Sequence, residues 1–180
     1  MSATKFKNKY RIKSTRRPSW NYANSGFYFV TICTQFRRPY FGKIKEKTMR
    51  LSDMGRAAMK YWADIPTHFP RVILDTFIVL PDHVHGLLQL TDISVPVSVS
   101  VETQNFASPP MPNGSHPPQK QQTLSSVIRG FKIGVTQFGD RNDIQFRWQT
   151  RFHDQIVRDV TQLNTIRRYI RNNVLKHSKK

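Results

Sequence analysis

Residues 77–90 read Phe77-Ile78-Val79-Leu80-Pro81-Asp82-His83-Val84-His85-Gly86-Leu87-Leu88-Gln89-Leu90, two apolar runs around the pair Pro81-Asp82. Proline presets φ and aspartate hydrogen-bonds its own backbone, so this pair favours a tight turn and the whole stretch predicts a β-hairpin. Because side chains alternate faces along a strand, His83 and His85 should point to the same side. Gly86 beside them would leave room for a ligand or another backbone to approach.

The two histidines admit two interpretations. Imidazoles one strand pitch apart on one sheet face can hold a single metal ion, or they can be two half-buried histidines with hydrogen-bonded rings. Cys33 is the only cysteine in the chain, which excludes cysteine-rich zinc coordination. Oxygen or nitrogen ligands would therefore have to complete any metal site.

The composition indicates the class of partner. The chain has 180 residues, enough for one domain, with 29 Lys and Arg against 11 Asp and Glu and a formal net charge of +18. Such a positive surface attracts polyanions, most commonly nucleic acid. No apolar run approaches the roughly 18 to 20 residues needed to cross a bilayer, and the N-terminus lacks the apolar region of a secretory signal. Together with the single cysteine, these features predict a cytoplasmic protein with no membrane partner.

The order of predicted elements is strand, helix, strand, strand, helix, strand, and then a last helix. The apolar positions after Ser52 have helical spacing until Pro66, and a second amphipathic helix begins at Thr123 or Ser125. In that second helix Gly130 and Gly134 form a smooth strip, for which we favour helix packing over ligand approach. The remaining elements are predicted at Phe27–Thr34, Val72–Leu80, His83–Leu90, about Phe152–Val157, and Thr161 to about His177.

The segments outside this pattern define the domain organisation. Residues 1–20 carry seven basic side chains and no acid, and we expect this arm, including Arg16 and Arg17, to bind phosphates. Residues 92–122 are rich in Ser, Pro, Gln and Asn and are predicted to be a flexible insertion in a domain spanning residues 21–177. Residues 178–180 form a short basic tail.

The last helix carries a candidate for phosphate chemistry. Its buried stripe is formed by Leu163, Ile166, Ile170 and Val174. Tyr169 and Asn173 are four residues apart and so lie one turn above the other on a neighbouring face. Three arginines surround them, at positions 167, 168 and 171. A tyrosine at a helix rim is also commonly a packing residue.

Taken together, these features resemble the single-tyrosine HUH-type transposases of insertion sequences, and most closely the REP-associated tyrosine transposases. The resemblance covers roughly residues 21–177 and departs at one point, where relatives commonly have Asn-Pro and this chain has Asn173-Val174. The four stretches that carry it, in family order, are Tyr28-Phe29-Val30-Thr31-Ile32-Cys33-Thr34, Leu80-Pro81-Asp82-His83-Val84-His85-Gly86, Val127-Ile128-Arg129-Gly130-Phe131-Lys132, and Ile166-Arg167-Arg168-Tyr169-Ile170-Arg171-Asn172-Asn173.

The resemblance implies an α+β fold with a ferredoxin-like β-α-β-β-α-β antiparallel sheet, helices on one face, and an additional C-terminal helix carrying the tyrosine. It also implies Tyr169 as the nucleophile and His83, His85 and Asn173 as ligands of Mg²⁺ or Mn²⁺. The family cleaves and rejoins single-stranded DNA beside a hairpin through a 5′-phosphotyrosine, and its members include monomers and homodimers in which the tyrosine helix serves the partner's histidines. We expect the phosphates to be contacted by Arg16, Arg17, Arg129, Lys132, Arg167, Arg168 and Arg171.

Two other functions remain open on the sequence. The first is a non-catalytic, basic nucleic-acid-binding module whose Tyr169 is structural. The second is a zinc-dependent hydrolase that uses His83, His85 and His153.

Overall fold

The computed structural model describes residues 5–6, 9–10, 19–92 and 122–174. The predicted insertion at residues 92–122, Arg16, Arg17 and the tail at residues 178–180 therefore lie almost wholly outside the described part. Within it, none of the helices combines the length and apolarity that crossing a membrane requires.

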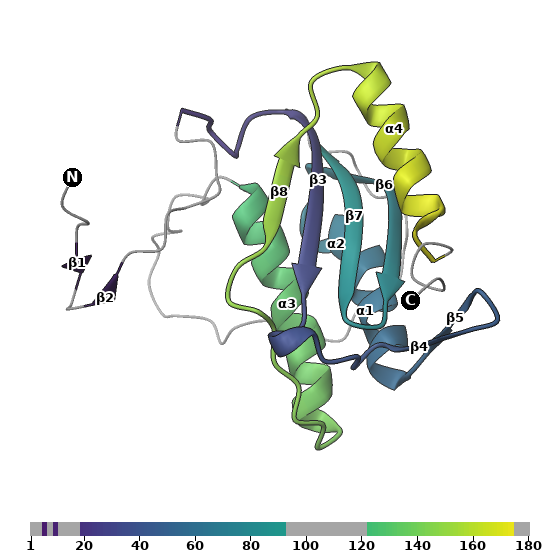
Figure 1. Ribbon diagram of the computed structural model, residues 1–180. Coiled ribbons are helices and arrows are strands. Elements are labelled where there is room, and N and C mark those ends of the chain that lie inside the picture. Colours follow the sequence, from purple (N-terminus) through teal and green to yellow (C-terminus); the bar gives the residue numbers. More distant parts are fainter. Residues whose placement is uncertain (1–4, 7–8, 11–18, 93–121, 175–180) are drawn as a thin grey trace.

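A four-stranded antiparallel sheet forms the centre of the molecule (Figure 1). Its strands are β3 (Gly26–Cys33), β6 (Val72–Leu80), β7 (His83–Leu90) and β8 (His153–Ile156), in the spatial order β6-β7-β3-β8. β6 and β7 pair directly across Pro81-Asp82, so the predicted hairpin is confirmed. With helices after β3 and β7, this order is that of a ferredoxin-like β-α-β-β-α-β fold, as predicted.

Two helices cover one face of the sheet. α1 (Asp53–Ala63) and α3 (Leu124–Arg141) connect the strands, and α2 (Ile65–His68) follows α1. Ser52 caps α1 by accepting a hydrogen bond from the Gly55 amide, and Thr123 caps α3 in the same way. The apolar stripes of these helices pack with alternate residues of β3 and β7 in the main core. The first helix ends three residues before Pro66, which lies instead in the first turn of α2.

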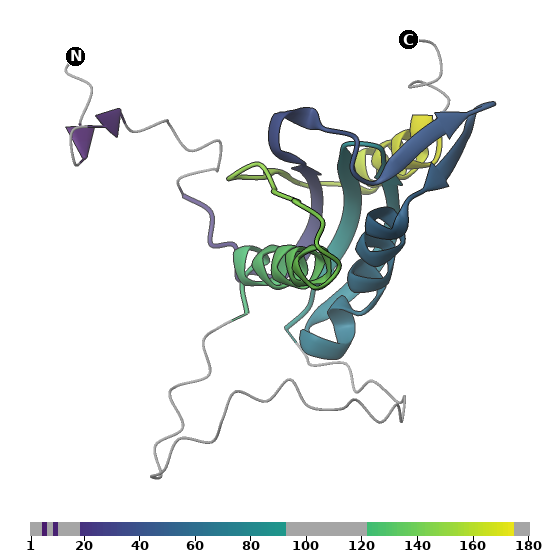
Figure 2. The same cartoon turned by 90° about the horizontal axis from the view of Figure 1, so that it is seen from below.

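α4 (Val160–Arg171) lies on the other face of the sheet, against β6 and β7 (Figure 2). A second, smaller core joins it to the sheet through Leu87, Leu163, Ile166 and Ile170. α4 ends at Arg171, and residues 175–180 lie outside the described part, so the predicted extension to about His177 is not tested. The predicted additional C-terminal helix is therefore present and carries Tyr169 beside the sheet.

Three glycines are explained by close packing. A Cβ atom on Gly86 would lie 2.0 Å from the Trp62 ring, so the missing side chain makes room for an indole. Our expectation that a ligand or another backbone approaches Gly86 was wrong, because its open side faces the main core rather than the histidines. Gly130 and Gly134 contact the rings of Phe69 and Tyr61, which confirms helix packing there.

Several smaller elements were not predicted. A second hairpin, β4 (Gly42–Lys45) and β5 (Thr48–Leu51), projects beside the turn between β6 and β7 (Figure 1). A 3₁₀ turn, η1 (Gln35–Arg37), follows β3 at the same end of the sheet. The short strands β1 (Lys5–Phe6) and β2 (Lys9–Tyr10) pair with each other within the N-terminal segment.

Candidate active site

The two histidines of the hairpin meet at the first residues of β7. His83 and His85 are only 2% and 5% exposed, and their Nε2 atoms lie 3.2 Å apart. The prediction that both imidazoles point to one side of the sheet is confirmed by this contact. Their side is the face that α4 covers in part, opposite the main core.

Each imidazole is oriented through its other nitrogen. Asp82 Oδ1 lies 2.5 Å from Nδ1 of His83, and Thr31 Oγ1 lies 2.9 Å from Nδ1 of His85. The Arg37 guanidinium binds the second carboxylate oxygen of Asp82 at 2.8 Å. Burial raises the pKa of Asp82, but the hydrogen bond and charge of His83 and the charge of Arg37 outweigh it and hold the pKa below its usual value. Asp82 is therefore an anion, and its carboxylate accepts a hydrogen bond from Nδ1 of His83.

A neutral His83 whose proton is on Nδ1 has a lone pair on Nε2, which faces Nε2 of His85. Two lone pairs 3.2 Å apart repel each other unless a proton or a cation lies between them. The Thr31 hydroxyl can either donate to Nδ1 of His85 or accept from it, so it is compatible with both arrangements. The cluster is thus built to present two imidazole nitrogens to one small positive centre.

The spacing fits a divalent metal ion. Two imidazole nitrogens bound at about 2.1 Å, with an angle between roughly 90° and 110°, lie about 3.0 to 3.4 Å apart. The observed 3.2 Å falls within that interval. Hydrogen bonds from Nδ1 to a carboxylate or hydroxyl are also the usual means of orienting metal-binding histidines.

Tyr169 of α4 reaches this cluster within the same chain. Its hydroxyl lies 3.4 Å from Nε2 of His85, and the residue is 37% exposed. The phenol packs edge-on against the rings of His85 and Phe29, with centroid distances of 5.4 Å and 6.0 Å. Tyr169 therefore borders both the paired imidazoles and solvent.

An ion pair holds α4 on the sheet. Nε and Nη2 of Arg167 donate to the carboxylate of Asp75 on β6, with the shortest contact at 2.5 Å. Burial raises the pKa of Asp75, but the hydrogen bonds from Arg167 and Thr76 outweigh that effect and lower it. Arg167, which we predicted to bind phosphate, thus holds on the sheet the helix that carries Tyr169, two residues further along.

Asn173 follows the C-terminal end of α4 and is buried, with 2% exposure. Its amide nitrogen has no hydrogen-bond partner among the described residues. Leaving a buried amide unpaired costs free energy. A flip of the amide would place its oxygen, a possible cation ligand, at this position.

His153 does not form a metal-binding group with His83 and His85. It lies on β8, opposite Thr31, and its side chain is exposed. In the described part of the chain, no group of three or more His, Cys, Asp or Glu side chains is arranged to hold a metal ion. The three-histidine zinc site that we considered is therefore not formed, and an amide, water or substrate oxygen would have to complete the shell.

The predicted phosphate-binding side chains fall into two groups. Arg129, Arg168 and Arg171 are exposed. Lys132 is partly buried, and its amine donates to the carbonyl oxygens of Gln149 and Arg151. Burial lowers the pKa of Lys132 to about 8. Phosphate binding by Lys132 would have to replace the two carbonyl contacts.

Comparison with known proteins adds a relative. No family model matches the chain. A search of curated proteins finds an uncharacterized protein of Haemophilus influenzae that is 34% identical over 162 residues, covering 89% of this chain and 87% of the relative. The chain belongs to the same family as that protein.

A solved structure shares the fold of this chain. It is a REP-associated tyrosine transposase bound to a REP hairpin, with a TM-score of 0.58 and 18% sequence identity, covering 92% of this chain and 74% of the other. The α+β arrangement with an antiparallel sheet is therefore common to both proteins.

Proposed function

We propose that this protein is a metal-dependent single-stranded DNA transposase and endonuclease of the HUH type, which cleaves and rejoins DNA at a hairpin-flanked site. One observation carries the proposal: the Tyr169 hydroxyl lies 3.4 Å from Nε2 of His85, at a pair of converging imidazoles. The shared fold with a REP-associated tyrosine transposase supports the same assignment.

In the proposed reaction the Tyr169 oxygen attacks a phosphorus of the DNA backbone. The new O–P bond forms as the bond to the 3′ oxygen breaks, which gives a 5′-phosphotyrosine and a free 3′-OH. The phenolic proton passes to solvent, and the departing 3′ oxygen takes one up. Because the phosphodiester energy is kept in the tyrosine ester, a later 3′-OH can reverse the attack and rejoin strands without a nucleotide cofactor.

The chain's own residues supply position and charge. The rings of Phe29 and His85 fix the phenol, and the Arg167–Asp75 pair fixes its helix. The exposed guanidiniums of Arg168 and Arg171 flank Tyr169 in sequence and would attract the scissile phosphate. Because the phenol and the imidazoles meet within one chain, we propose that cleavage uses the tyrosine of the same chain.

The proposed metal ligands are His83, His85 and Asn173. A divalent ion held there, Mg²⁺ or Mn²⁺, would polarise the phosphate and hold it in line. Two neutral imidazoles and an amide leave several coordination positions for phosphate and water oxygens.

The proposed substrate follows from the net charge of the chain and from the ligand of the solved structure that shares its fold. A net charge of +18 favours any phosphate chain, whereas the related structure was solved with a REP hairpin. We therefore propose DNA with a hairpin and single-stranded flanks. The logarithm of the binding constant for this DNA should fall as the logarithm of the salt concentration rises. The slope should be about 0.7 for each contacted phosphate of a single strand.

The test is covalent capture. The purified full chain is incubated with a radiolabelled hairpin oligonucleotide and Mn²⁺, and the products are separated in denaturing detergent. The proposal requires a protein–DNA adduct that Tyr169→Phe abolishes while DNA binding persists. Tyr61→Phe, at a ring that packs against Gly134 on α3, is the matched control and should retain the adduct.

The other outcomes support other functions. DNA binding without an adduct in the wild-type protein, at any Mn²⁺ or Mg²⁺ concentration, would favour the non-catalytic binding module. Cleavage that survives Tyr169→Phe would mean that water is the nucleophile. His83→Ala and His85→Ala should each remove the adduct, and an adduct that persists in both variants would refute the metal site.

A further inference from the structure

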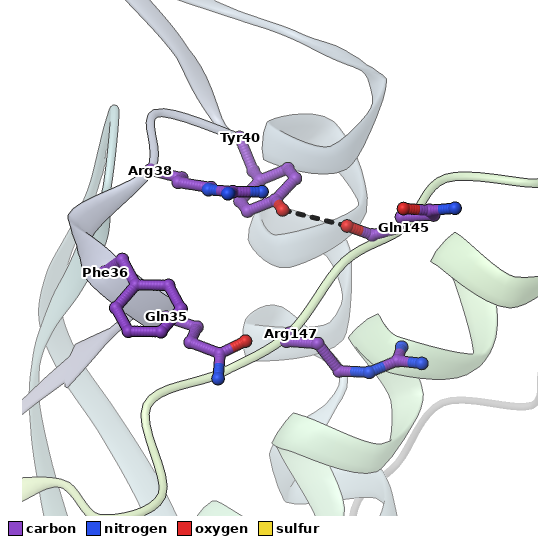
Figure 3. Close-up of a pocket in the computed structure, with 6 residues that line it drawn as sticks. All are labelled: Gln35, Phe36, Arg38, Tyr40, Gln145 and Arg147. Carbon is purple, nitrogen blue, oxygen red and sulfur yellow. Dashed lines mark hydrogen bonds between the residues drawn. The ribbon is translucent and has the colours of Figure 1, made fainter.

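A pocket lies at the end of the sheet that carries the histidine hairpin. It has a volume of about 360 Å³, at the lower end of the range for small-ligand sites. Two segments face each other across it, the chain around η1 and the chain before β8 (Figure 3). The lining residues are Gln35, Phe36, Arg38, Tyr40, Gln145 and Arg147.

Phe36 is held in an unusual conformation. The residue is 81% exposed, the highest value among the large hydrophobic residues of the described chain. Its φ of 55° and that of Arg37, 56°, both lie in the left-handed region, which costs roughly 1 kcal/mol or more for a residue with a Cβ atom. Exposing a phenyl ring on strained backbone contributes nothing to the core. A ligand that stacks on the ring would account for both features.

The walls around that ring suit a nucleotide. None of the six lining residues is acidic, and two are arginines. Arg147 uses one nitrogen, Nη1, for the Phe146 carbonyl and for a 3.8 Å contact with Asp140, so its other nitrogens can bind a ligand. The amides of Gln35 and Gln145 offer both donors and acceptors to a base edge.

The pocket wall is tied to the proposed active site. The Thr34 amide donates to the Asp82 carbonyl at 2.9 Å, and the Phe41 amide donates to the Pro81 carbonyl at 2.9 Å. Thr31, opposite His85, lies only four residues before Gln35, at most about 13 Å along an extended chain. A DNA strand bound at Tyr169 would therefore need only a few nucleotides to reach the pocket.

We propose that this pocket binds one unpaired DNA base, stacked on Phe36, with an adjoining phosphate on Arg38 and Arg147 and the base edge read by the two glutamine amides. The proposal rests on the proposed function for its ligand class, since it assumes a single-stranded DNA substrate. It adds a sequence-reading position to an enzyme whose cleavage chemistry is itself indifferent to sequence.

The experiment uses full-length Tyr169→Phe protein without metal, so that binding is measured apart from cleavage. The probe is a synthetic hairpin with short single-stranded thymidine arms, in which one thymidine at a time is replaced by 5-iododeoxyuridine. Irradiation should give a cross-link that peaks at one arm position, in a peptide containing Phe36. Cross-linking that is even along the arms, or that maps away from the pocket, would overturn the proposal.

Variants give an independent measure of the same contact. Phe36→Ala should weaken binding of the hairpin probe by roughly 5- to 150-fold, and Phe36→Trp should preserve it. Arg38→Gln should lower the salt dependence of binding by about 0.7 log units per log unit. The controls are Ile133→Ala, at an exposed apolar residue of α3, and Arg158→Gln, beyond the opposite end of the sheet, both expected to bind as the parent.

Failure of this proposal can be told from failure of the proposed function. If Phe36→Ala binds the probe as tightly as the parent, the pocket does not hold a base, whether or not the Tyr169 adduct forms. If the wild-type chain forms no adduct but the cross-link and the loss of affinity appear as expected, the pocket proposal stands and the transposase proposal falls.

Discussion

Thr31→Val removes one oxygen atom from the histidine cluster and leaves its shape almost unchanged. The Thr31 hydroxyl lies 2.9 Å from Nδ1 of His85, which is 5% exposed, so the ring nitrogen loses its partner in a dry environment. Hydrogen bonds of this kind to metal-binding histidines typically change metal affinity by about 10- to 100-fold, or roughly 1.4 to 2.7 kcal/mol. We expect Mn²⁺ binding to weaken by that factor. Stability without metal should fall by about 1 to 2 kcal/mol.

The assay is titration calorimetry with MnCl₂, together with urea unfolding without metal. Thr136→Val is the matched control, because the Thr136 hydroxyl also donates a 2.9 Å hydrogen bond, to the Lys132 carbonyl in α3. The Mn²⁺ affinity of this control should equal that of the wild type, whatever its stability. An unchanged Mn²⁺ dissociation constant in Thr31→Val would refute the reasoning that this hydroxyl orients a metal ligand.

Three further predictions concern the scaffold. Gly86→Ala should lower the free energy of unfolding by about 1 to 3 kcal/mol, because the added Cβ would meet Trp62 at 2.0 Å; an unchanged melting temperature would contradict this packing. Asp75→Asn should loosen the helix held by Arg167 and reduce adduct formation more than DNA binding, as compared by denaturing gel and fluorescence anisotropy. Burial lowers the pKa of Lys132 to about 8, so the folded state loses that proton at lower pH than the unfolded state does. The stability of the wild type relative to Lys132→Met should therefore rise between pH 8 and 10.5. Urea midpoints of the two proteins that change in parallel with pH across that range would contradict this prediction.

Local sequence patterns determined the elements and several members of the site. The alternation around Pro81-Asp82 identified the hairpin and the shared direction of His83 and His85, because side-chain direction in a strand repeats every two residues. Helical spacing and capping residues likewise identified the helices that cover the sheet. Tyr169 lies within α4, whereas Asn173 follows the end of that helix at Arg171, so helical geometry alone does not fix their relative positions.

The partners that orient the site were not visible in the sequence. Thr31 meets His85 across 54 residues, and Arg167 meets Asp75 across 92. These contacts depend on strand register and on how α4 sits on the sheet, and neither is encoded by the residues next to each position. Neither Thr31, a threonine in a strand, nor Asp75, an aspartate before a threonine, has a local sequence signal of such a role. Asp82 was predicted only as a turn residue.

The sequence by itself determined which elements form and which face of each carries its chemistry, because those properties follow from backbone periodicities of two and 3.6 residues. Tertiary structure alone decided that the phenol of Tyr169 lies beside the imidazoles of the same chain, that Gly86 faces an indole, and that Phe36 stands exposed over a pocket. Each of these results depends on packing between segments that are far apart in the chain. The sum of many contacts determines such packing, and no local sequence pattern reveals that sum.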